Sequence, residues 1–168
     1  MNAYHAELKV ENMLEREQIH YYIPKHYIIK KNRYGQTRQL VPVIPGLVFV
    51  HSTFHVLNEF QRPLSFFSFV TMPHLEGGHS TLKVPDAEME NFIKISSHSE
   101  EKLRYYRPDE VDLKKGQRIR IIGGVFDGAE GVLLKVKGIR DKRLVVSLPN
   151  LLTVAATHIE PEFIQLLL

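Results

Sequence analysis

The hydrophobic pattern of the chain begins as a helix and then changes to strands. Apolar residues recur at helical spacing through 6–14, which predicts an amphipathic helix that docks one side on a sheet and carries Glu7 on the other. From Tyr21 onward, aromatic and β-branched residues predominate and lead into the turn-forming segment 32–35. The pattern therefore predicts a helix, then a strand, then a hairpin with its tip near Gly35.

The next apolar run, over 40–50, is interrupted by proline and glycine. Pro42 and the pair Pro45-Gly46 disrupt a sheet ladder, so we expect a sharp bend before an apolar strand that begins at Leu47. Thr53 is suited to cap a short helix after that strand. The aromatic cluster that follows is expected to return as a strand: Phe66, Phe67 and Phe69.

The second half of the chain changes from a helical pattern to short strands. Pro85 is suited to the first turn of a helix, and the residues after that helix are polar and without a period. From Leu113 onward, short apolar segments alternate with glycine turns, a pattern typical of a small β-barrel. We therefore expect one domain over 1–96, a linker over 97–110 and a barrel domain over 111–168.

Composition places the chain among ordinary globular proteins and narrows its chemistry. Hydrophobic residues make up 43% and charged residues 24% of the 168 residues, which is sufficient for a packed core. Because cysteine is absent, disulfides, thiolate metal sites and a cysteine nucleophile are excluded. No apolar run approaches the roughly 20 residues needed to cross a bilayer, so we expect a cytoplasmic protein without membrane contact.

Positive charge is concentrated in the predicted hairpin. The net charge of +3 permits contact with nucleic acid without requiring it. No acidic residue occurs between Glu17 and Glu59, whereas several cations lie inside this window. A solvated loop is the simpler interpretation, and phosphate binding is the functional one. The candidate nucleic-acid-binding residues are Lys30, Lys31, Arg33 and Arg38.

The segment 116–132 closely resembles the KOW motif of NusG-type factors and of some ribosomal proteins. Its glycines permit a positive φ or a close backbone approach, and the phenylalanine between them is expected to fill the barrel. The residues that carry the motif are Gly124, Phe126, Gly128 and Gly131.

A second family motif lies earlier in the chain. Tyr22-Ile23-Pro24, followed by the basic hairpin and by 44–50, resembles the signature of the N-terminal domain of NusG-type transcription factors. The amino-acid sequences of segments 50–53 and 111–116 are most similar to those of the UpxY-type antiterminators of capsular polysaccharide operons. The resemblance implies an α+β fold with a ferredoxin-like N-terminal domain and a small SH3-like KOW barrel.

The resemblance also implies a function and partners. NusG-type N-terminal domains bind the clamp helices of RNA polymerase through an apolar patch and suppress pausing, with non-template DNA or nascent RNA nearby. Core packing is the simpler interpretation of the same apolar residues here. A monomer without cofactors is expected. The residues carried over as polymerase-binding are Pro45, Gly46, Leu47 and Phe49.

The sequence departs from the family pattern at three places. The family usually opens with a tryptophan-led strand, whereas this chain begins almost at its first helix. Leu47 replaces the tyrosine that usually follows Pro-Gly. Pro149 or Asn150 stands where the general factor has a phenylalanine that contacts the termination factor Rho and a ribosomal protein. Neither of those two contacts is therefore expected.

Other functions remain as alternatives. A KOW-type RNA-binding protein of the ribosome or its assembly shares the barrel motif, and a protein-only adaptor would use the barrel without touching nucleic acid. His51 and His55 stand four apart, but the metalloprotease glutamate and a third ligand are missing, so no metal site is predicted. No nucleophile or carboxylate pair has a catalytic setting, so no enzymatic activity is predicted.

Overall fold

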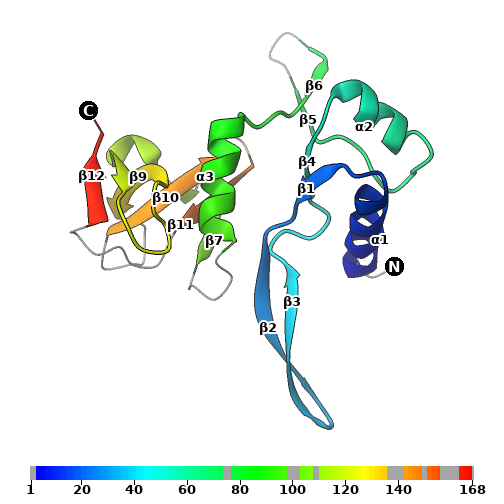
Figure 1. Cartoon of the computed structure of the whole chain (residues 1–168), viewed down its shortest axis with the longest axis horizontal. Helices are drawn as coiled ribbons and strands as arrows, with labels where there is room; N and C mark the ends of the chain where they lie inside the picture. Colours follow the sequence, from blue (N-terminus) through cyan, green and yellow to red (C-terminus); the bar gives the residue numbers. More distant parts are fainter. Residues whose placement is uncertain are drawn as a thin grey trace. The chain divides into compact units, whose positions relative to one another are not determined.

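The computed structural model describes residues 3–73, 77–97, 103–107, 110–135, 142–148, 151–155 and 163–167. Contacts divide the chain into two compact units, one of residues 1–23 and 41–83 and the other of 24–40 and 84–168. The described residues contain three α-helices and mostly antiparallel strands (Figure 1). This mixture agrees with the predicted α+β class, whereas the ferredoxin-like and SH3-like arrangements remain predictions.

The first unit is built around the helix α1, Ala3–Arg16. Val10 and Leu14 are buried as the helical pattern predicts, and α1 lies against the strand β1, His20–Tyr22. Glu7 is also buried, which contradicts its expected place on the solvent side of the helix. The reason is a backbone hydrogen bond to a distant turn, described below.

Two short antiparallel pairs and one further helix complete the first unit. Strand β1 pairs with β4, Phe49–His51, in a register that sets Tyr21 opposite Val50. Helix α2, Phe54–Gln61, follows at once, and the Thr53 side chain caps it by accepting a hydrogen bond from the Val56 backbone at 3.4 Å. The remaining pair joins β5 to β6: Thr71–Pro73 and His79–Thr81.

The phenylalanines after α2 do not form the expected strand. They lie in a turn and extended segment before β5, and two of them contact α2 through their rings. Phe69 stacks on Phe54 with centroids 5.3 Å apart, and Phe67 meets Phe60 edge to face at 5.5 Å. Aromatic packing on the helix therefore takes the place of the sheet pairing that local β-propensity suggested.

Along the sequence, a two-stranded hairpin lies between the two segments that make up the first unit. Its strands are β2, Lys25–Asn32, and β3, Gly35–Pro42, which form a sheet of their own. A connection of two residues requires the strands to be antiparallel. The hairpin therefore confirms the strand, turn and strand expected from the sequence.

The second unit contains a six-stranded antiparallel sheet in the order β12-β8-β9-β10-β11-β7. The strands β8 to β11 agree closely with the short strands expected between glycine turns. A 3-10 turn, η2, precedes β8 at Leu113–Lys115. The strands span Arg104–Tyr106 (β7), Gln117–Ile121 (β8), Glu130–Lys135 (β9), Lys142–Leu148 (β10), Leu152–Ala155 (β11) and Ile164–Leu166 (β12).

Strand β10 is buried on both of its faces. Val145 packs in a cluster with Val111 and Leu134, and its two neighbours, Leu144 and Val146, are also buried although they point to the opposite face. A continuous apolar run of this kind is typical of a strand with both faces covered.

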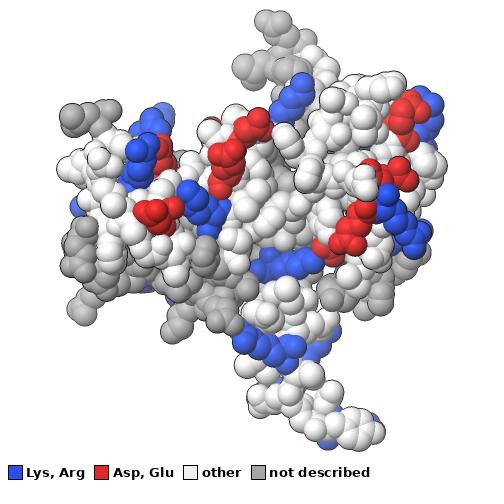
Figure 2. Space-filling view, viewed as in Figure 1, with Lys and Arg blue, Asp and Glu red and all other residues white. Residues whose placement is uncertain are grey.

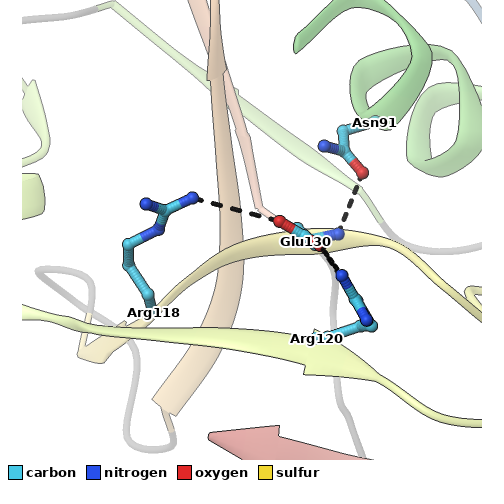
Figure 3. A network of polar contacts seen from close by, with 4 residues as sticks. All are labelled: Asn91, Arg118, Arg120 and Glu130. Carbon is cyan, nitrogen blue, oxygen red and sulfur yellow. Dashed lines mark hydrogen bonds and ion pairs between the residues drawn. The ribbon is translucent and has the colours of Figure 1, made fainter. Parts of the chain in front are cut away.

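Helix α3, Asp86–Ser96, supplies part of that cover. It packs against β10 and β11 and buries Phe92 and Ile95 (Figure 1). The Asn91 side-chain oxygen accepts a hydrogen bond of 2.9 Å from the Glu130 backbone N–H, which attaches the helix to the start of β9. Figure 3 shows this contact beside the ion pairs that Glu130 makes with Arg118 and Arg120 on the adjacent strand β8.

The two compact units do not follow the domain boundaries expected from the sequence. Helix α3 belongs to the second unit, although it lies within the expected first domain of 1–96. Strand β7 lies within the expected linker of 97–110, and here it forms the edge of the sheet. The division into 1–96, 97–110 and 111–168 therefore stays a prediction about how the chain folds in solution.

Candidate functional site

The residues predicted to contact polymerase begin at a tight turn in the first unit. The Leu47 backbone N–H donates to the Ile44 carbonyl at 3.3 Å, and Gly46 has φ of +81°. Proline followed by a glycine of positive φ is the signature of a type II turn, and it produces the bend expected before Leu47. Pro45 and Gly46 are exposed at this turn.

A buried carboxylate holds this turn in place. Glu7 on α1 is 3% exposed, and its Oε1 accepts a hydrogen bond from the Gly46 backbone N–H. Its second carboxylate oxygen is buried and has no hydrogen-bond partner. Sequence reasoning missed Glu7 because its partner is a backbone group 39 residues away along the chain. The turn is thus fixed to the helix rather than left as a free loop.

The strand after the turn is shorter than expected and half-buried. It begins at Phe49 rather than at Leu47, and both Leu47 and Phe49 are partly accessible. On the paired strand, the Tyr21 hydroxyl donates to Glu15 Oε1 at 2.7 Å. Burial raises the pKa of Tyr21 above its usual range, and the hydrogen bond to Glu15 raises it further. Tyr21 therefore remains a neutral hydrogen-bond donor at physiological pH.

Four predicted nucleic-acid-binding residues lie on the hairpin β2–β3, in the second unit. All four are exposed, and in Figure 2 this hairpin carries blue Lys and Arg atoms without red carboxylates among them. The Arg38 guanidinium lies 3.7 Å from the centre of the Tyr27 ring, a cation–π contact that orients it. The structure thus brings the hairpin cations together on one element: Lys30, Lys31, Arg33 and Arg38.

An exposed aromatic surface on the first unit was not expected from the sequence as a partner site. Phe54 is 59% exposed at the start of α2, where it stacks on Phe69. Phe66 is also exposed, and the Lys9 ammonium lies 4.6 Å from the centre of its ring. The only sequence signal was the density of phenylalanine in 54–69.

The residues of the KOW-like segment surround the turn between β8 and β9. Phe126 is buried, and Gly124 and Gly128 have φ near +70°. A Cβ on Gly131 would lie 2.6 Å from the Val145 carbonyl oxygen, so only glycine fits there without movement of the backbone. These positions shape the sheet, and their assignment to a KOW motif stays a prediction.

Some expectations fall outside the described residues or find no structural counterpart. Pro149 and Asn150 lie outside the described residues. His51 and His55 are both exposed, and the described part of the chain contains no group of three or more metal-binding side chains. Within the described ranges, no helix has the length and apolar character required to span a bilayer.

Comparison with known protein families shows what the first part of the chain is similar to. Residues 2–93 match the family model described as transcription termination factor NusG. No curated protein matched the chain. The matched region contains the Pro45–Gly46 turn, the hairpin β2–β3 and the aromatic surface on α2.

Proposed function

We propose, because this chain belongs to the NusG family, that it is an operon-specific regulator of transcription elongation which promotes antitermination and suppresses pausing. Factors of this family regulate transcription rather than catalyse reactions, and their NusG domains bind RNA polymerase. The family match over 2–93 carries the proposal, since it covers the part of the chain that would meet the enzyme.

The polymerase-facing surface is centred on the Pro45–Gly46 turn and the strand after it. Pro45 and Gly46 are exposed, and Leu47 and Phe49 keep accessible apolar area. The hydrogen bond from Gly46 to Glu7 supports this role, because a fixed turn loses little conformational entropy on binding. The partner on polymerase is the pair of clamp helices of the largest subunit, bound through these apolar side chains.

The hairpin cations supply the contact with nucleic acid. A cluster of exposed lysines and arginines without neighbouring carboxylates attracts phosphates and reads them without regard to sequence. In an elongation complex, non-template DNA and nascent RNA are the available strands. The residues proposed for this contact are Lys30, Lys31, Arg33 and Arg38.

The regulated genes are those of polysaccharide biosynthesis. This assignment is supported by the amino-acid sequences of segments 50–53 and 111–116, which are similar to those of the UpxY-type antiterminators. The alternative of a ribosomal RNA-binding protein rests on the KOW-like segment alone and leaves the match over 2–93 unexplained. The operon-specific regulator is therefore the preferred function.

Binding to an isolated clamp-helix fragment tests the polymerase surface. Leu47→Asp and Phe49→Ala should each weaken binding by about tenfold or more, because they remove apolar contact area at the centre of the surface. Readthrough of a terminator in a purified transcription system should fall in parallel.

Val125→Asp is the matched control, since it adds the same charge at an exposed position of the second unit. It should leave binding and readthrough unchanged. If folded Leu47→Asp and Phe49→Ala proteins also bind and act normally, the surface around Pro45 does not contact polymerase.

A further inference from the structure

The pairing of β1 with β4 sets two histidines opposite each other in the first unit. His20 begins β1 and His51 ends β4, and the antiparallel register makes them direct partners (Figure 1). Opposed residues of an antiparallel pair point to the same side of the sheet, with Cβ atoms about 4.5–5.5 Å apart. Both side chains are exposed. The two imidazoles therefore share one solvent-accessible face at the end of this strand pair.

This pair differs from the pair that the sequence alone draws attention to. His51 and His55 stand four apart, but that spacing aligns two metal ligands only when both lie on one helix. His51 lies on β4, whereas α2 begins at Phe54, so these two histidines belong to different elements. His20 is distant from His51 in sequence, and only the strand register brings the two together.

Both histidines lie on backbone that neighbouring contacts hold in place. Immediately before His20, the Ile19 backbone N–H donates to the Leu14 carbonyl of α1 at 2.9 Å. Shortly after His51, the Thr53 side chain caps α2. A site whose ligands are already positioned loses little conformational entropy when it binds. The strand pair therefore presents the two imidazoles in a fixed relation.

The separation of the two side chains suits a transition-metal ion. Two Zn–N bonds of about 2.0–2.1 Å at a tetrahedral angle place the two nitrogens roughly 3.3 Å apart. Rotation about the side-chain bonds of two opposed histidines brings their ring nitrogens to that separation. Imidazole is a ligand that zinc, nickel and copper ions accept, whereas magnesium and calcium ions prefer oxygen. The chemistry of the pair thus favours a divalent transition metal.

We propose that His20 and His51 together bind one divalent transition-metal ion, zinc in the first place, with water molecules in the remaining coordination positions. The bound ion joins β1 to β4 and so stabilises the strand pair that contains Phe49. The inference goes beyond the proposed function, because metal binding at this pair requires neither polymerase nor nucleic acid.

Isothermal titration calorimetry of the full chain with zinc chloride tests the site. His20→Ala and His51→Ala should each lower the affinity of the strongest zinc site by about tenfold or more, because each removes one of two protein ligands. His20→Cys supplies a thiolate ligand and, under reducing conditions, should bind zinc more tightly than His20→Ala. Nickel chloride should show the same dependence on both histidines, and magnesium chloride should show none.

Two control variants address the other histidines, of which the chain has nine in total. His79→Ala is the matched control, because His79 is an exposed strand residue whose direct partner is Pro73 rather than a second imidazole. His55→Ala tests the pair that the sequence alone draws attention to. Both variants should bind zinc as tightly as the unchanged protein.

Thermal unfolding gives a second readout. An ion that binds only the folded chain raises the midpoint of unfolding as the free zinc concentration increases. This rise should appear in the unchanged protein and in His79→Ala, and it should be much smaller in His20→Ala and His51→Ala. Equal zinc affinity in His20→Ala and the unchanged protein would overturn the inference. So would a loss of affinity in His51→Ala and His55→Ala that His20→Ala does not share.

Discussion

Glu7 is the residue with the largest gap between its sequence pattern and its structural role. A carboxylate at a polar position of an amphipathic helix is normally solvated, yet Glu7 is buried and accepts the Gly46 backbone N–H. Periodicity assigns helix faces by hydrophobicity, so it cannot detect a carboxylate whose partner is a backbone group elsewhere in the chain. Val10 and Leu14, which have no such partner, were placed correctly by the same pattern.

Replacing Glu7 should loosen the Pro45–Gly46 turn. Glu7→Ala leaves the Gly46 N–H without its partner, and we expect the free energy of unfolding to fall by about 1–3 kcal/mol. Glu7→Gln keeps a carbonyl oxygen at the same place and should lose less. Urea denaturation of the three proteins measures the difference.

Glu17→Ala is the control for this pair, since Glu17 is an exposed carboxylate just after the same helix. It should leave the unfolding free energy within about 0.5 kcal/mol of the starting value. A loss in Glu7→Ala no larger than the loss in Glu17→Ala would mean that the hydrogen bond to the turn contributes nothing.

At the scale of elements, the local sequence pattern predicts secondary structure correctly where residues close in sequence determine it. The hairpin β2–β3 and the short strands of the sheet follow from turn residues and alternation, and both were predicted. Phe67 and Phe69 do not form the expected strand because their rings pack on α2, a contact that strand propensity does not include. Tertiary packing, rather than local propensity, therefore determines the structure of that segment.

The packing of α3 on the sheet was also missed, although the sequence contained a signal for it. The residues Leu144, Val145 and Val146 form an unbroken apolar run, whereas a strand with one solvent-exposed face would alternate apolar and polar residues. Such a run requires a second layer over β10, and α3 provides one. The residues predicted to bind polymerase could be chosen only through family resemblance, because buried strands and binding strands have the same composition.

The hydrogen bond between α3 and β9 is testable by amide exchange. Asn91→Ala removes the acceptor of the Glu130 N–H at a partly buried site, so that amide should exchange faster and unfolding free energy should fall by about 1–2 kcal/mol. Glu90→Ala changes the adjacent exposed residue and should alter neither quantity. Unchanged exchange at Glu130 in Asn91→Ala would show that the helix does not rest on the sheet in solution.

At the scale of the whole molecule, the two compact units and the expected domains make different predictions for fragments. A fragment of 84–168 keeps α3, whose Phe92 and Ile95 are fully buried, whereas a fragment of 97–168 lacks them. Removal of two large buried side chains should cost several kcal/mol, roughly 2–5 for each. We therefore expect a clearly higher midpoint of thermal unfolding for 84–168, measured by circular dichroism.

The opposite result would restore the boundary expected from the sequence. If 97–168 unfolds at the same temperature as 84–168, then α3 belongs with residues 1–96 and contributes nothing to the sheet. A fragment of 84–168 with Phe92→Ala serves as the matched variant, because it keeps the helix and loses only the ring. Its midpoint should lie between those of the two fragments.

The exposed ribbon β2–β3 also has a consequence for the protein when no partner is present. A free strand edge with apolar side chains is a template on which another chain can add a strand, and this is a common route to aggregation. Lysines at such an edge oppose that addition, because a second ribbon would bring the same charges into contact. Lys30 and Lys31 therefore discourage self-association while they leave the ribbon accessible to a polyanion.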